Sequence, residues 1–505
     1  MTNDTTTPVI VGAGQFLNRT DEGAGPLSPV ELMHEATRRA SGDAGAGGSS
    51  LIDRLQVLAV VPIISWRYRD PGRILASRLG CDGVRTWYPS MGGNTPQMML
   101  NRICTMVAAG DLEVALLTGA EAWNTRTSAK RAGSRPEWED EDPSAAPDWG
   151  GDDTFSLGHP AEHARGIVAP VQAYPLFETA LMHDAVASGA AGSFEEHIAR
   201  TGEVWAGFSR VAAGNPNAWN RTPMSAAEIT TATPQNRYVG WPYTKRMVSN
   251  PDVDMSSALI VTSAAAARAA GVPKDRWVFP WSGTDGTDLV MSNRESFTRS
   301  PSIGIAGRRS LELAGVTLDD VEHLDVYSCF PSAVQLFCRE FDLDPLSRPL
   351  SVYGGLTFGG GPWNNPVGHA LATMTETLRG SERALGFVTA NGGNVDKHAF
   401  GVLGTEPPPD GFRYERPQEE IEAAAVPKAV LTDHEGPVAV EAWTVMHDRT
   451  NQPERFLGSC LTPAGERVWV AGDDPELMRT AMTDDIAGTA AVAGPGGTIE
   501  LDTAP

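Results

Sequence analysis

The chain has 505 residues, and its 63 acidic and 40 basic side chains give a formal net charge of −23. A single hydrophobic core stops growing at about 250–300 residues, so we expect two or three domains. A surface this negative repels nucleic acid and anionic lipid, and the sequence has no basic run that would compensate. The composition therefore disfavours nucleic-acid and membrane partners.

The sequence also bounds the compartment and the cofactors. The first residues lack a basic segment followed by an apolar one, and no apolar run approaches the ~20 residues of a membrane helix. The cysteines are odd in number and lack CxxC spacing, which argues against a disulfide framework or a zinc site. They are Cys81, Cys104, Cys329, Cys338 and Cys460. We expect a cytoplasmic protein with reduced thiols, no metal and no resident cofactor.

Short apolar runs alternate with helical patterns along most of the chain. This alternation predicts mostly buried sheets with helical crossovers. The predicted strands are Val9–Ala13, Leu55–Val61, Val114–Gly119, Leu259–Thr262, Trp277–Phe279, Leu324–Tyr327 and Leu385–Thr389.

Two segments of the chain look alike. GGNTPQMMLNRICTMVAAGDLEVALLTGAEA and GPWNNPVGHALATMTETLRGSERALGFVTANGG each run from a Gly-rich turn into a helix and then a strand. The same number of positions separates Asn94 from Thr118 and Asn365 from Thr389. A duplicated α/β unit is the simplest account, and coincidence between two generic helix–strand units is the alternative.

Composition changes mark the remaining parts of the chain. Residues 124–250 are rich in Trp, Pro, Gly and acidic residues, which indicates an inserted loop domain. Its acidic stretch from Glu137 to Asp153 is interpreted as a solvated loop, with a docking surface as the alternative. Beyond a Pro-rich stretch after Thr405, four short alternating strands predict a small antiparallel barrel or sandwich. The predicted domains are 1–123 with 251–265, then 124–250, 266–410 and 425–505.

The repeated helices begin in a way that favours ligands. Asn94 or Thr95 can act as N-cap with Pro96 in the first turn, and the second helix repeats this with Asn365 as cap. Gly92 and Gly93 allow backbone to pass closely. A buried helix that opens on such a turn favours an anion or an activated nucleophile at its N-terminus. A well-capped core helix without a ligand is the alternative.

These features together resemble a known superfamily. Two helix N-termini directed at one site from duplicated halves, the GGLTFGGGPWNNPVG segment and the closing FVTANGG turn resemble thiolases of the sterol-carrier type over about residues 8–405. With its added C-terminal domain, the chain most closely resembles thiolase-like protein type 1. The resemblance implies a duplicated thiolase fold with a layered α/β/α/β/α core, an inserted loop domain and a C-terminal β-barrel of the oligonucleotide/oligosaccharide-binding type.

The residues at the positions of thiolase catalysis differ from the family pattern. The nucleophilic cysteine falls on Gly93, with Ser90 as the only nucleophile-like neighbour, and the Gly-His-Pro histidine falls on Asn365. The second cysteine falls on Ala390, or on Thr389 after a one-residue slip. The family's Asn-Glu-Ala-Phe segment reads Tyr-Ser-Cys-Phe from Tyr327. The resemblance therefore implies that condensation or thiolysis through an acyl-cysteine is lost.

Other residues are candidates for a different chemistry. His369 lies one helical turn beyond Asn365 on the same face, so His369 and Tyr327 are candidates for proton transfer. We interpret Cys104 and Cys329 as packing residues, and His398 as a structural hydrogen-bonding residue.

The main hypothesis is a non-catalytic protein that binds CoA or acyl-CoA, with the thioester near Gly93 and His369. The alternative is an acyl-CoA enzyme, acyltransferase-related or a retro-aldol lyase, in lipid or sterol side-chain metabolism. Nucleic-acid binding by the barrel is disfavoured because a basic, aromatic-rich groove is missing.

Ligand contacts and assembly follow from these hypotheses as expectations. The basic residues of WPYTKRMVS are expected to bind the CoA phosphates, with a solvated basic turn as the alternative. The expected ligand-binding residues are Tyr243, Lys245, Arg246, Asn94 and Thr95. A thiolase-type homodimer and a monomer are both compatible with the sequence, and a chain ending near residue 425 is expected to stay folded.

Overall fold

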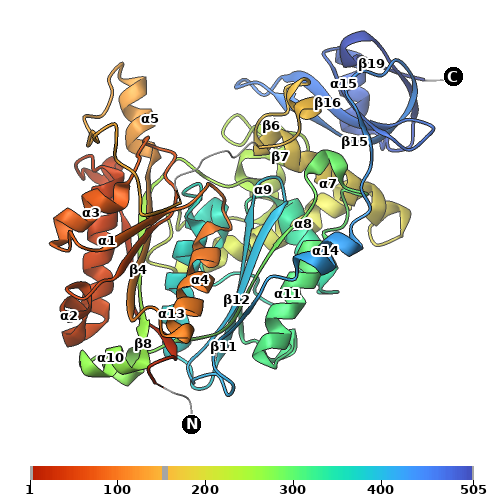
Figure 1. Cartoon of the computed structure of the whole chain (residues 1–505). Coiled ribbons are helices and arrows are strands. Elements are labelled where there is room, and N and C mark those ends of the chain that lie inside the picture. Colours follow the sequence, from red (N-terminus) through yellow and green to blue (C-terminus); the bar gives the residue numbers. More distant parts are fainter. Residues whose placement is uncertain (1–3, 151–156, 503–505) are drawn as a thin grey trace.

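The computed structural model describes residues 4–150 and 157–502, and Figure 1 shows the whole chain. Its first large sheet pairs β1 antiparallel with β8, pairs β8 antiparallel with β4, and continues in parallel to the far edge. Across the sheet the strands are β1 (Pro8–Leu17), β8 (Asp254–Ser263), β4 (Val114–Ala122), β2 (Val57–Val60), β3 (Arg85–Tyr88) and β5 (Trp149–Gly150). The outer helices are α1 (Pro29–Asp43), α2 (Gly48–Ile52), α3 (Pro71–Leu79) and α10 (Ala264–Ala269).

The second sheet is built from the later part of the chain. Across it the strands are β10 (His323–Asp325), β11 (Leu385–Gly392), β12 (Lys397–Gly404), β9 (Phe279–Thr287) and β13 (Arg413–Glu415). On its outer side lie α11 (Pro301–Ala314), α12 (Pro331–Glu340) and α14 (Gln418–Ala424). A backbone bridge between Ile10 and Val278 joins this sheet to the first one.

The two repeated helices form the middle layer. Helices α4 (Thr95–Ala109) and α13 (Pro366–Arg379) contact each other and strands of both sheets, and Figure 1 shows them between β4 and β11. Each helix leads into a strand, α4 into β4 and α13 into β11. The predicted layered α/β core is therefore confirmed, with the duplicated units side by side.

The inserted region is more regular than the sequence indicates. It holds α5 (Trp123–Arg131), α6 (Pro160–His163), α7 (Pro170–Ala187), α8 (Phe194–Gly214), α9 (Ala226–Thr230), β6 (Tyr238–Gly240) and β7 (Tyr243–Thr244). Of the acidic stretch from Glu137 to Asp153, residues 151–153 lie outside the described residues. No helix in the described ranges is long and apolar enough to cross a membrane.

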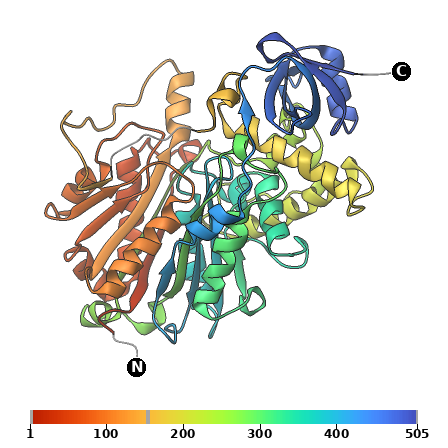
Figure 2. The same ribbon diagram turned by 45° about the vertical axis from the view of Figure 1, so that its right-hand side comes forward.

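The last domain is a mainly antiparallel sheet with one helix. Across it the strands are β14 (Val430–Leu431), β17 (Arg467–Gly472), β16 (Pro453–Leu461), β15 (Gly436–His447), β18 (Ala490–Ala493) and β19 (Ile499–Leu501), with α15 (Pro475–Thr483) beside them. Its long strand β15 also pairs with β6 of the inserted region through Met446 and Gly240. Figure 2 shows this domain beside the inserted helices.

Buried contacts tie the last domain to the thiolase-like core. The Arg467 guanidinium is fully buried and donates to the carbonyl oxygens of Met291, Ser292 and Arg294. Trp469 donates from Nε1 to Oγ of Ser292 at 2.8 Å. A buried cation and an indole of the last domain thus have their partners in the rest of the chain. That a chain ending near residue 425 stays folded remains a prediction.

Candidate functional site

A cavity of about 440 Å³ opens where the two repeated helices begin. It is formed by the Met91–Gly93 turn before α4, the end of β11, the Tyr327–Phe330 segment and the first turns of α7. Ligand pockets are commonly of this size and mostly apolar, with a few polar groups. Within the described ranges, no Asp, Glu, Lys, Arg or His lines it. Gly93, beside which the thioester end of a ligand is expected, lies in its wall.

Gly93 lies in the cavity wall, but there is no free space for a side chain on it. A Cβ atom at this position would lie 2.2 Å from the Tyr327 hydroxyl and 2.4 Å from the Asn391 carbonyl oxygen. These distances are far below van der Waals contact. The position assigned to the thiolase nucleophile is thus occupied by neighbouring atoms.

The two adjacent asparagines before α13 have different positions. Asn365 is buried outside the cavity, and its Nδ2 donates to the Gly119 carbonyl at 2.9 Å and to Ser257 Oγ at 3.1 Å. Asn364 lines the cavity, accepts from the Gly92 amide at 3.1 Å and donates to the Pro62 carbonyl at 2.9 Å. Asn364 therefore links the starts of the two repeated helices, a role that the sequence assigned to no residue.

A small hydrogen-bonded cluster lines the cavity near β11. Asn391 donates from Nδ2 to the Tyr174 hydroxyl at 3.0 Å, and this hydroxyl donates to the Gly393 carbonyl at 3.1 Å. Burial raises the pKa of the Cys329 thiol to about 12 and the pKa values of the Tyr174 and Tyr327 phenols well above 10. At neutral pH these three groups are protonated, so they can donate hydrogen bonds but cannot act as bases.

His369 does not reach this cluster. It is fully buried in α13, its Nδ1 lies 2.8 Å from Gln15 Oε1, and its ring stacks on Tyr353. Burial lowers its pKa to about 3. It is absent from the described lining of the cavity, so the expectation that the thioester lies near His369 is corrected: the side chain points toward β1 instead.

Ala390 and Thr389 lie on β11 just before the cavity. Ala390 is buried, and Thr389 Oγ1 accepts a hydrogen bond from the Tyr327 amide at 2.9 Å. Neither residue lines the cavity, whereas the next residue, Asn391, does. Thr389 therefore helps to hold Tyr327 in place.

The expected phosphate-binding residues do not line the cavity either. Tyr243 is fully buried and its hydroxyl donates to Glu178 Oε2 at 2.7 Å, so its predicted ligand contact is corrected. Arg246 donates to the Glu228 carbonyl at 3.0 Å, and Lys245 is exposed. The described lining in this part of the chain begins at Val248.

The predicted helix-start residues lie close to the cavity without lining it. Asn94 Oδ1 is buried without a hydrogen-bond partner among the described residues, and a Cβ on Gly392 would lie 2.5 Å from it. Thr95 Oγ1 donates to the Ser90 carbonyl at 3.4 Å. Asn94 and Thr95 therefore lie at the start of α4, as predicted, but neither side chain makes a capping hydrogen bond to this helix.

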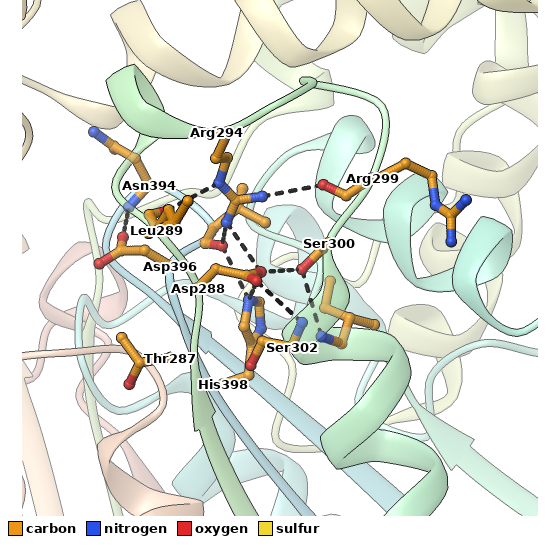
Figure 3. A network of polar contacts seen from close by, with 12 residues as sticks. Thr287, Asp288, Leu289, Arg294, Arg299, Ser300, Ser302, Asn394, Asp396 and His398 are labelled. Carbon is orange, nitrogen blue, oxygen red and sulfur yellow. Dashed lines mark hydrogen bonds and ion pairs between the residues drawn. The ribbon is translucent and has the colours of Figure 1, made fainter. Parts of the chain in front are cut away.

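A buried polar network holds the turn that carries Gly393 into the cavity (Figure 3). Val395 has φ of 64°, an unfavourable conformation for a β-branched residue. Its carbonyl accepts hydrogen bonds from Arg294 and from His398 Nε2, and Arg294 also pairs with Asp288 at 3.2 Å. Burial lowers the pKa of His398 to about 4. The structural interpretation of His398 agrees with this geometry.

The other cysteine singled out from the sequence, Cys104, lies inside α4. It is completely buried, and burial raises the pKa of its thiol. Among the described residues there is also no cluster of three His, Cys, Asp or Glu side chains that could hold a metal ion.

Comparisons with known proteins agree with this architecture. Residues 417–498 match the family described as the thiolase-like protein type 1 additional C-terminal domain. A monomeric SCP2-thiolase like protein type 1 from Mycobacterium smegmatis is 27% identical, with a TM-score of 0.82 over 99% of this chain and 100% of that chain. No curated protein matches the chain.

Two further solved structures share the core fold. The Ltp2-ChsH2(DUF35) aldolase has 18% identity and a TM-score of 0.56 over 80% of this chain and 98% of that chain. The dimeric peroxisomal thiolase of Saccharomyces cerevisiae has 11% identity and a TM-score of 0.57 over 80% of this chain and 99% of that chain.

The layered core and its likeness to these solved structures show the thiolase fold. Within it, the full-length likeness and the C-terminal match support assignment to thiolase-like protein type 1.

Proposed function

We propose that this protein binds CoA or an acyl-CoA thioester and does not carry out thiolase chemistry. The observation that carries the proposal is the cavity at the N-terminus of α4, where a ligand-sized apolar space meets the Gly93 turn. An acyl thioester is uncharged, and it suits a lining that offers hydroxyl, thiol and amide groups instead of ionic ones.

The loss of thiolase chemistry follows from what surrounds Gly93. An acyl-enzyme needs a nucleophile and a base that activates it. Tyr327 and the Asn391 carbonyl occupy the space of a side chain at position 93, and the described cavity lining holds no histidine or carboxylate. Cys329 supplies a thiol to the described cavity wall, and burial disfavours its thiolate.

A second candidate function is an acyl-CoA lyase or acyltransferase-related activity in lipid or sterol side-chain metabolism. The observation in its favour is the pair of phenols, Tyr174 and Tyr327, in the cavity wall. Their raised pKa values make them hydrogen-bond donors, which stabilise a developing oxyanion without forming a covalent intermediate.

The likeness to a solved structure bears on the oligomeric state. The similar Mycobacterium smegmatis protein is described as monomeric and matches 99% of this chain. We propose that this protein is a monomer as well.

One experiment separates the two candidate functions. Purified protein is titrated with CoA and a series of acyl-CoA species by calorimetry, and the same mixtures are analysed by chromatography for new products. Binding without turnover supports the proposed function, and product formation with any acyl-CoA supports the second candidate. If no CoA species binds, both candidates are rejected.

A further inference from the structure

A second, larger hollow of about 930 Å³ lies beside the apolar cavity. Five cations line it, from the segment after β2, from α5 and from the segment after α5: Arg67, Arg69, Arg126, Lys130 and Arg135. Its described lining contains no Asp or Glu. We call this hollow the basic groove. In a chain of net charge −23, a concave surface whose described charged side chains are all positive concentrates a local positive potential.

Most interactions of the groove cations with the described chain do not involve acidic side chains. Within residues 4–150 and 157–502, none of the five forms an ion pair, and the side chains of Arg67 and Lys130 make no hydrogen bond. Arg126 and Arg135 stack on the rings of Trp123 and Trp66, at 4.9 and 4.5 Å from the ring centroids. Stacking holds a guanidinium in place while its edge remains able to bind an anion.

The acidic stretch next to the basic groove is engaged elsewhere. Glu141 accepts from the backbone amides of Arg69 and Asp70, and Glu139 accepts from the hydroxyls of Ser28 and Tyr68. The lone pairs of these carboxylate oxygens that accept from the amides and hydroxyls are not available to the cations of the groove. The described part of this stretch is therefore a largely exposed loop, as expected from its composition, which Glu139 and Glu141 anchor to the core.

The basic groove adjoins the apolar cavity. Ile64 and Met91 line both, and Met91 leads directly into the Gly92–Gly93 turn. One extended ligand can thus place an anionic end in the basic groove and an apolar end in the cavity. A ligand with a diphosphate and a long uncharged arm has this distribution of charge.

We propose that the basic groove binds the phosphate groups of the ligand, and that a CoA-type molecule enters past Ile64 and Met91 to place its thioester end beside Gly93. This inference rests on the proposed function for the identity of the ligand. It replaces the phosphate contacts expected at Lys245 and Arg246 with contacts on α5 and on the segments that follow β2 and α5.

The test uses two variants of the full-length protein with equal changes of charge. The groove variant is Arg67→Glu/Lys130→Glu. The wild-type side chains at both positions make no hydrogen bond or ion pair within the described chain, so the substitutions remove no such contact from the folded protein. The control variant is Arg221→Glu/Lys245→Glu. Both of these residues are also exposed, and neither belongs to the described lining of the groove or the cavity. Calorimetry measures the affinities for CoA, for pantetheine, which lacks phosphate, and for inorganic pyrophosphate.

We expect the groove variant to bind CoA at least about tenfold more weakly than wild type, a free-energy difference of about 1.4 kcal/mol. Its affinity for pantetheine should be unchanged, and the control variant should bind both as wild type does. Pyrophosphate should bind wild type and not the groove variant, with an affinity that falls as salt rises.

The outcomes separate this inference from the proposed function. If CoA binds wild type and the groove variant equally, the inference is overturned and the proposed function stands. If the control variant loses CoA affinity instead, the phosphate site lies near Arg221 and Lys245 and the inference is likewise overturned. If pyrophosphate binds the basic groove but CoA does not bind wild type, the anion site stands and the proposed function fails.

Discussion

The hydroxyl of Tyr327 lies where the first side-chain atom of residue 93 would have to be, 2.2 Å from an ideal Cβ. The glycine and the tyrosine are therefore a matched pair. Because the tyrosine hydroxyl fills this position, the absence of a side chain at residue 93 does not leave an empty space.

Gly93→Ala should destabilise the protein by about 1–3 kcal/mol, because the new methyl group overlaps the Tyr327 hydroxyl and the Asn391 carbonyl oxygen. Gly83→Ala is the matched control, since it is exposed and a Cβ there meets nothing within 4 Å. Chemical denaturation of both variants measures the difference. Equal stability of the two variants would show that the space at Gly93 is open after all.

Arg294→Met should lower the free energy of unfolding by about 3–5 kcal/mol, because it leaves Asp288 buried without its cation. The same change should weaken ligand binding, since the Val395 carbonyl loses its guanidinium donor and the turn bearing Gly393 loosens. Arg38→Met is the control: it removes an exposed pair with Glu35 and should cost at most about 1 kcal/mol. Similar losses in both variants would contradict the structural role of the buried network.

The buried histidine His369 predicts a dependence of stability on pH. Its folded-state pKa of about 3 is far below its ordinary value of 6.5. Between these values the unfolded chain binds a proton that the folded chain does not, so this contribution to stability is complete above pH 6.5 and is lost as the pH falls toward 3.

In this pH range the wild-type protein should take up about one proton at His369 when it unfolds. The variant His369→Gln should lack this proton uptake. Denaturation midpoints of wild type and variant between pH 5 and 7.5 test this by the difference in slope. Wild type must be compared with the variant because burial also raises the pKa of Glu121 to about 7 and that of Asp325 to about 6. These two carboxyls make stability fall as the pH rises, opposite to the effect of His369. Parallel slopes would mean that His369 is accessible to protons in the folded protein.

Removal of residues 426–505 should lower the melting temperature and broaden the transition, because the carbonyl groups that accept from Arg467 and the Ser292 hydroxyl then lose their buried partners. Arg467→Met in the full chain should reproduce part of this loss. Scanning calorimetry compares the three proteins. An unchanged, cooperative transition in the shortened chain would restore the view of two independent cores.

The sequence was most informative about local patterns. The starts of α4 at Thr95 and α13 at Pro366, and the starts of the strands β4 and β11 that follow them, were predicted within a residue or two because glycine turns and apolar faces mark them. Strand β12, from Lys397 to Gly404, was missed because its run continues directly from the FVTANGG turn without a separate signal. Helices α7 and α8 were missed because Trp, Pro and Gly in the inserted region indicated irregular structure.

The cavity wall was harder to predict than the fold. Tyr174, Asn364 and Asn391 come from three distant parts of the chain, and their contacts depend on how the layers pack and not on any spacing in the sequence. One residue of register decides that Asn364 lines the cavity while Asn365 is buried. The basic groove was missed for the same reason, since its cations are spread from Arg67 to Arg135 and form no basic run.

A ligand site without thiolase chemistry is tested most directly with acetoacetyl-CoA and free CoA. These are mixed with protein that has been purified free of host thiolase. The account predicts that calorimetry detects binding of the thioester and that no acetyl-CoA forms, since the space at Gly93 is filled by Tyr327. CoA-dependent production of acetyl-CoA that scales with protein concentration would contradict the account.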